Sequence, residues 1–125
     1  MKLDKDLVRE ILLAIEANED DPYNAFVMEL PEREDIEVSY HLMLLHEAGF
    51  IHAQNLSSPS GISWYPMRLT YSGHEFLDTV RNGEVWELTK AGAEKVGSVS
   101  IGLMLELGKA YAKQLLKDRL GIELP

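Results

Sequence analysis

The sequence contains no cysteine among its 125 residues. This absence excludes disulfide bonds, thiolate nucleophiles and cysteine-ligated zinc. Long apolar runs are also missing, because no stretch approaches the roughly 18 residues that a membrane-spanning helix needs. The N-terminus, Met1 to Asp6, alternates charged and apolar residues and lacks the apolar segment of a signal peptide. We therefore expect a cytoplasmic globular protein with no membrane contact.

Basic residues are scarce in the first half of the chain. Residues 1–60 contain four Lys or Arg and thirteen Asp or Glu, whereas residues 61–125 contain eight of each, so the first half carries the whole net charge of -9. Proteins hold nucleic acids mainly by neutralising phosphates with Lys and Arg. The charge distribution therefore argues against nucleic-acid binding by elements in residues 1–60.

The N-terminal third predicts one full helix and two short elements. Apolar residues at helical spacing indicate a core-facing helix from Leu3 to about Ala17, which ends in turn formers before Pro22. Residues Ala25–Leu30 are typical of a short strand. Pro31–Asp35 is too short and polar for a complete helix, so we expect a second helix reduced to about one turn.

A third helix is expected from about Glu34 to Glu47, and Gly49 can close it in left-handed geometry. The apolar residues of this helix predict that much of it is covered by protein. One side carries Ile36, Tyr40, Met43 and Leu44, and the apolar surface is widened by Val38, Leu42 and Leu45.

A β-hairpin should follow this helix. We predict strands at Phe50–Asn55 and Ile62–Tyr71 joined by the polar loop Leu56–Gly61. Pro66 lacks a backbone donor, which places it at an edge or a bulge. The period of two puts one set of side chains on a single face of the second strand, namely Tyr65, Met67, Leu69 and Tyr71.

The remainder predicts helices. Ser72–Glu75 has the spacing of a capping box and begins a helix that runs to about Arg81. A further helix is expected over Gly83–Val96, followed by a joint at Gly97-Ser98 and a last helix over Val99–Leu120. We therefore divide the chain into a winged-helix-like domain at 1–82 and a C-terminal helical extension at 83–125, which packs on it or forms a dimer contact.

This order of elements predicts an α+β fold of the winged helix-turn-helix class, with helix, short strand, reduced second helix, third helix and hairpin wing. Three blocks and Val85-Trp86 resemble a family of small, uncharacterised bacterial proteins, often phage- or prophage-encoded, classified as a domain of unknown function. The blocks are Met1–Leu13, Tyr40–Ile51 and Leu69–Asp78. The resemblance implies a winged-helix-like fold with a helical tail and brings no known activity or ligand.

Candidate contacts for a nucleic acid or a partner lie on three elements. The third helix offers Ser39 and His41, with Arg33 just before it, but carboxylates surround all three. The alternative is a solvated acidic face, which the charge favours. The wing and the last helix add Ser57, Ser58, Ser60, Trp64, Arg68, Lys109, Lys113 and Lys117. Their ordinary interpretations are a polar hairpin loop and the wet side of an amphipathic helix.

The last helix also carries a broad apolar surface that suits a homodimer contact. The residues proposed for that contact are Leu103, Leu107, Gly108, Tyr111 and Leu115. Packing of the same helix against the first helix of its own chain explains the pattern equally well.

No pattern indicates an enzyme, a cofactor or a metal site. His41 and His46 are five residues apart on one helix, which turns them away from a shared ion. We therefore expect a non-enzymatic regulatory or accessory factor of a phage or mobile element that works by protein contact. The alternative is a DNA-binding transcriptional regulator. Whether the acidic residues imitate DNA stays open.

Overall fold

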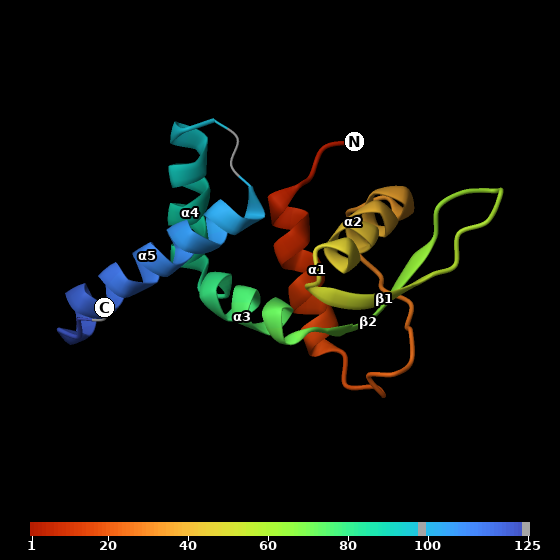
Figure 1. Ribbon diagram of the computed structural model, residues 1–125, viewed down its shortest axis with the longest axis horizontal. Helices are drawn as coiled ribbons and strands as arrows, with labels where there is room; N and C mark the ends of the chain where they lie inside the picture. Colours follow the sequence, from red (N-terminus) through yellow and green to blue (C-terminus); the bar gives the residue numbers. More distant parts are fainter. Residues whose placement is uncertain (98–99, 124–125) are drawn as a thin grey trace. The chain divides into compact units, whose positions relative to one another are not determined.

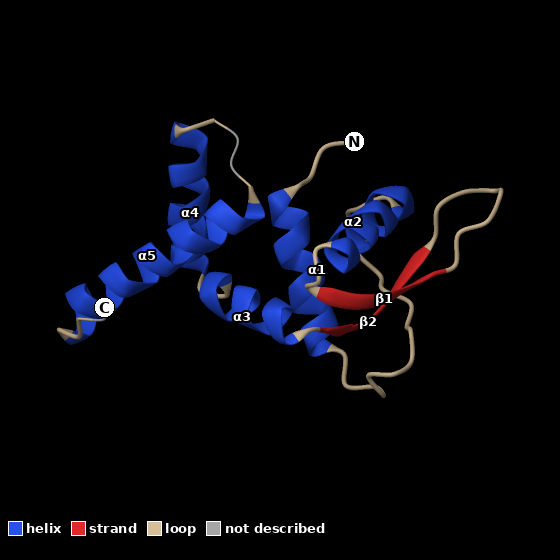
Figure 2. Cartoon of the chain, in the orientation of Figure 1, coloured by secondary structure: helices blue, strands red, loops and turns tan. Residues whose placement is uncertain are grey.

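The computed structural model describes residues 1–97 and 100–123 (Figure 1). Within these residues it contains five helices and one two-stranded antiparallel sheet, which confirms the α+β class (Figure 2). The chain forms two compact units, Met1–Glu75 and Phe76–Pro125, here called the first and second unit, and their boundary falls inside helix α3 (Tyr71–Val80). Among the described helices, none is both long and apolar enough to cross a bilayer.

Helix α1 (Lys5–Ala17) forms as predicted. The Asp4 side chain caps it by accepting a hydrogen bond from the Leu7 N–H at 3.1 Å. One side of the helix is buried over its whole length and packs against α2 and β2. The buried side chains are Leu7, Val8, Ile11, Leu12 and Ile15.

The predicted strand at 25–30 is wrong. This segment makes a single backbone hydrogen bond to the hairpin, from the Phe26 N–H to the Pro66 carbonyl at 3.0 Å. Because Pro66 has no N–H to return the bond, a β ladder does not propagate from this position. The segment that follows forms a turn, in which the Arg33 N–H donates to the Leu30 carbonyl at 2.9 Å, so Pro31–Asp35 does not form a complete helix, as predicted.

Helix α2 (Asp35–Glu47) confirms the predicted third helix, and Gly49 closes its end with a φ of +82°. Of the predicted apolar surface, Val38, Leu42 and Leu45 are buried, whereas Ile36 is 59% exposed. The helix has apolar residues on both sides, so periodicity alone does not select one of them. The buried residues are Val38, Ser39, His41, Leu42 and Leu45.

The hairpin pairs β1 (Ile51–Asn55) with β2 (Trp64–Leu69). A bulge interrupts the register between His52 and Ala53, opposite Pro66, as the proline predicted. The bulge changes which side chains of β2 point inward, so the predicted face of alternating residues is wrong. Pro66 and Leu69 are the buried pair.

Helix α3 does not begin with the predicted capping box at Ser72–Glu75. Instead, the Thr70 Oγ1 accepts from the Gly73 N–H at 3.1 Å and donates to the Gly49 carbonyl at 2.6 Å. The Thr70 N–H in turn donates to the Phe50 carbonyl at 3.0 Å. A Cβ on Gly73 would lie 2.0 Å from that same carbonyl oxygen. This junction therefore joins the end of α2 to the start of α3 and requires glycine at 73.

In the second unit, α4 (Gly83–Lys95) packs against α5 (Ile101–Leu120), close to the two helices predicted there. The Asn82 side chain caps α4 by accepting from the Glu84 and Val85 N–H groups. Residues 98–99, within the predicted joint and the predicted helix start, lie outside the described residues.

Candidate functional site

The outward side of α2 is unusually apolar. At about 100° per residue, Ile36, Tyr40 and Met43 fall opposite the buried stripe of Val38 and Leu45. We call Ile36, Tyr40, Met43 and Leu44 the α2 outer face. Ile36 is exposed and the other three are half-buried. A large apolar side chain left exposed on a helix marks a surface that can gain free energy by being covered.

Exposed carboxylates lie at both ends of the α2 outer face. Glu34, Asp35 and Glu47 are exposed at the two ends of α2. Between Arg9 and Arg68 the sequence has eleven Asp or Glu and a single cation. The first unit therefore carries the whole net charge of the protein, since Phe76–Pro125 contains seven residues of each sign.

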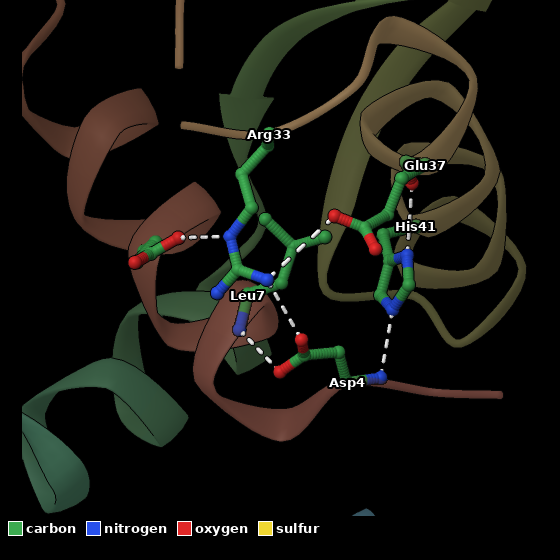
Figure 3. Close-up of polar contacts among 6 residues, drawn as sticks. Asp4, Leu7, Arg33, Glu37 and His41 are labelled. Carbon is green, nitrogen blue, oxygen red and sulfur yellow. Dashed lines mark hydrogen bonds and ion pairs between the residues drawn. The ribbon is translucent and has the colours of Figure 1, made fainter. Parts of the chain in front are cut away.

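That single cation, Arg33, is engaged within the first unit (Figure 3). Its guanidinium lies 2.8 Å from an oxygen of Asp4, 3.1 Å from Glu10 and 3.6 Å from Glu37. Asp4 and Glu10 hold the pKa of Arg33 above its usual value. Burial raises the pKa of Asp4, but the Leu7 N–H and Arg33 outweigh it and lower that pKa overall. Arg33 thus joins α1, the turn and α2.

We expect Arg33→Gln to lower the free energy of unfolding by about 1 kcal/mol, because three carboxylates lose a partly exposed partner. Urea unfolding of the full chain measures this change. Arg81→Gln is the matched control, since Arg81 makes an exposed ion pair with Asp78 at 2.9 Å and should cost less than half as much. Equal losses in the two variants would contradict a supporting role for Arg33.

The same contact has a pH signature. Because the pKa of Asp4 is lower in the folded chain than its usual 3.8, the stability that it contributes is complete above that pH and is lost as the pH falls through its folded pKa. Arg33→Gln should therefore flatten the loss of stability below pH 3.8, and parallel slopes for variant and parent would contradict it.

Ser39 and His41 are buried rather than presented at the surface. The His41 Nε2 accepts from the Asp4 N–H at 2.8 Å, and its Nδ1 donates to the Glu37 carbonyl at 2.9 Å (Figure 3). The Ser39 Oγ accepts from the Trp64 N–H at 3.1 Å. Both side chains therefore hold neighbouring elements to α2, and we leave them out of the candidate surface.

The three loop serines of the hairpin are exposed and bond mainly to the loop itself. The Ser57 Oγ accepts from the Ser63 N–H at 2.9 Å, and the Ser58 and Ser60 hydroxyls lie 2.6 Å apart. The backbones of Ser58 and Gly61 exchange hydrogen bonds across the tip. This loop therefore has a defined shape set by its own side chains.

The two remaining hairpin candidates differ in exposure. Trp64 is half-buried, with its ring centroid 5.4 Å from that of His46, whose Nδ1 accepts from the Ala53 N–H. Arg68 is exposed, and its guanidinium donates to the Leu69 carbonyl at 3.1 Å. Trp64 is therefore placed beside α2, whereas Arg68 lies at the other end of β2.

The lysines of α5 are exposed, but acidic groups accompany them. Lys109 lies 3.7 Å from Glu106, and Lys117 lies 3.1 Å from Glu123. Lys113 is exposed between them. The ridge is therefore partly neutralised along its length.

The residues proposed for a dimer contact are divided between surface and interior. Leu103 is 57% exposed, and Leu107, Tyr111 and Leu115 are half-buried. Gly108 is buried, and a Cβ there would lie 3.1 Å from the Thr79 methyl group of its own unit. Among these five described residues, Leu103 is the one whose side chain is mostly exposed and could contact a second molecule.

A cavity of about 300 Å³ opens beside α2 in the first unit. Sequence reasoning did not find it, because its walls come from three separate segments: residues 27–28, α2 and residues 62–65. It is lined by Val27, Met28, Asp35, Val38, Ser39, Leu42, Ile62, Ser63, Trp64 and Tyr65.

Comparison with known proteins identifies relatives without an assigned activity. The family described as "Hypothetical protein (DUF2513)" matches residues 2–100. An uncharacterized protein of Haemophilus influenzae (strain Rd) is 35% identical over 127 residues, which cover 96% of this chain and 99% of that protein. No solved structure matches the chain significantly.

Proposed function

The chain belongs to the DUF2513 family, and we propose that it is a non-enzymatic winged-helix protein that binds another protein through the α2 outer face. Its setting would be that of an accessory or regulatory factor of a phage or mobile element. The observation that carries the proposal is the exposed apolar side of α2, set among carboxylates and without an available cation.

The order of elements in the first unit supports the winged-helix assignment. Helix α1, the turn at Pro31–Arg33, α2 and the hairpin β1–β2 correspond to a helix, a reduced second helix, a third helix and a wing. In DNA-binding members of this class the outer side of the third helix enters the major groove. Here that side presents Ile36 and Tyr40, and neither side chain carries a positive charge that could neutralise a phosphate.

The same side chains suit a protein partner. Burying an isoleucine or an aromatic side chain contributes about 1.5–3 kcal/mol when it is fully covered. Tyrosine is also among the residues that contribute most to protein interfaces, and charged rims around such residues select the partner. The half-buried positions of Tyr40 and Met43 leave their side chains partly fixed before contact, which lowers the entropy lost on binding.

The test compares two surface variants of the full chain as baits in a lysate of the encoding organism, with bound proteins quantified by mass spectrometry. We expect Ile36→Arg to reduce recovery of the specific partner at least about tenfold. Val96→Arg is the matched control because Val96 is 70% exposed on the second unit, and it should retain the partner. Retention by both variants would overturn the proposal.

A mobility-shift assay on duplex DNA completes the test. We expect no shift at low salt, where phosphate contacts are strongest. A shift that weakens steeply as salt rises would favour the regulator of transcription instead.

A further inference from the structure

We infer that the cavity beside α2 is a socket for a cationic side chain, an arginine or lysine of the protein partner. The inference rests on the proposed function, because it assumes that a protein covers the α2 outer face. It adds the chemistry of that partner, namely a basic residue projecting from the segment that lies on Ile36 and Tyr40.

The walls of the cavity suit the two parts of such a side chain. Val27, Met28 and Ile62 offer apolar surface to the methylene stem. Trp64 and Tyr65 are neighbours in β2, so one of the two rings points to the cavity side of the strand, and an aromatic face attracts a guanidinium or ammonium group. The Asp35 carboxylate supplies a charge-assisted acceptor for the same group. A volume of about 300 Å³ lies at the small end of ligand pockets and fits one side chain.

Among the described residues, no cationic side chain of the first unit lines the cavity or pairs with Asp35. The cavity lining contains no Lys or Arg. Within the described part of the chain, the Asp35 carboxylate makes no hydrogen bond or ion pair, whereas the nearest cation in sequence, Arg33, contacts three other carboxylates. The site therefore has an acidic group in place and no internal counter-charge.

Charge also decides among occupants. A phosphate or a nucleic acid would meet the carboxylates that outnumber cations around α2 and would be repelled. A second copy of the same face carries the same excess of acid, so two such faces repel each other. A basic protein segment is the occupant that the electrostatics favour.

The cavity is placed where such a segment would pass. Three α2 residues of the cavity lining directly precede residues of the α2 outer face, namely Asp35, Ser39 and Leu42. The cavity and the α2 outer face therefore lie side by side, about 100° apart around the helix. The N-terminal end of a helix disfavours cations, but the carboxylates of Asp35 and Glu37 in the first turn offset this effect.

The experiment is an NMR titration of the ¹⁵N-labelled full chain with N-acetyl-arginine amide, and with its neutral isostere N-acetyl-citrulline amide. We expect the arginine probe to shift the amides of the residues that line the cavity, including those of Asp35, Trp64 and Tyr65, with weak but saturable binding. The citrulline probe should bind at least about fivefold more weakly, because it lacks the charge. Equal binding of both probes, or shifts confined to Trp86, would overturn the inference.

Two variants each remove one negative charge, one inside the cavity and one outside it. Asp35→Asn should weaken the arginine probe at least about fivefold, whereas Glu19→Gln, an exposed position outside the cavity, should not. Equal effects of the two variants would overturn the inference. The proposed function can fail separately. If the parent chain binds the arginine probe as expected but the Ile36→Arg variant still captures the protein partner, the cavity binds a cation and the α2 outer face is not the interface.

Discussion

Gly73→Ala is expected to lower the free energy of unfolding by about 3 kcal/mol or more, or to prevent the first unit from folding. The added Cβ would lie 2.0 Å from the Phe50 carbonyl oxygen, which is fixed backbone rather than the end of a flexible side chain. The same oxygen accepts the Thr70 N–H, and Thr70 caps α3 and bonds to Gly49. Moving the carbonyl would therefore disturb the end of α2, the start of β1 and the start of α3 together.

Urea unfolding followed by circular dichroism measures this loss. Gly83→Ala is the matched control, because a Cβ at Gly83 meets nothing within 4 Å and alanine is the better helix former. It should be neutral or slightly stabilising. A Gly73→Ala variant that unfolds at the same urea concentration as the parent would contradict the close approach at this junction.

His41→Ala should cost about 3 kcal/mol. The ring is fully buried, so its removal leaves a cavity between α1 and α2. The Asp4 N–H loses its acceptor, and the Glu37 carbonyl loses a donor. The Asp4 amide is partly buried, so losing its partner adds a desolvation cost, and Asp4 is also the residue that caps α1 and pairs with Arg33.

His46→Ala is the comparison for this variant. His46 is half-buried, and the hydrogen bond that its ring accepts from the Ala53 N–H is 3.2 Å long, so we expect a loss of about 1 kcal/mol. Denaturant unfolding gives both values, and exchange of the Asp4 amide with solvent should accelerate only in the His41 variant. A His41→Ala chain as stable as the His46→Ala chain would show that the two bonds of His41 contribute little.

Local patterns predicted the elements that depend on local chemistry. Helix α1 was found because its apolar spacing is regular and one-sided, and its end coincides with turn-forming residues. Gly49 marked the end of α2 because the left-handed conformation favours glycine. Pro66 marked the bulge because it lacks a donor. In each case the physical constraint acts within a few residues of the pattern that reveals it.

The errors arose where tertiary contacts decide. The strand expected at 25–30 has suitable residues, but the adjoining position of β2 is a proline and does not complete a ladder. His41 was expected at the surface of α2 because it is polar by type, but it is buried through bonds to Asp4 and Glu37 that come from tertiary packing and backbone. Composition alone does not show that a polar side chain has hydrogen-bond partners in the interior.

The sequence showed the charge of the candidate site and the four apolar residues of the α2 outer face, but not that Ile36 lies at the surface. The excess of acid and the scarcity of cations were plain, but the depth of Ser39 and His41 and the engagement of Arg33 depend on contacts far apart in the sequence. The cavity is a further case, since Val27, Asp35 and Trp64 come together only when the hairpin folds beside α2. The residue pattern of one helix does not show which residues of other segments line a cavity beside it.

The uneven division of charge gives the first unit a negative electrostatic field of its own, since the whole excess of acid lies in Met1–Glu75 and Phe76–Pro125 is balanced. In dilute buffer this field attracts a cationic protein before any side chains touch. The rate at which such a protein encounters the first unit should therefore fall as added salt shortens the range of the field.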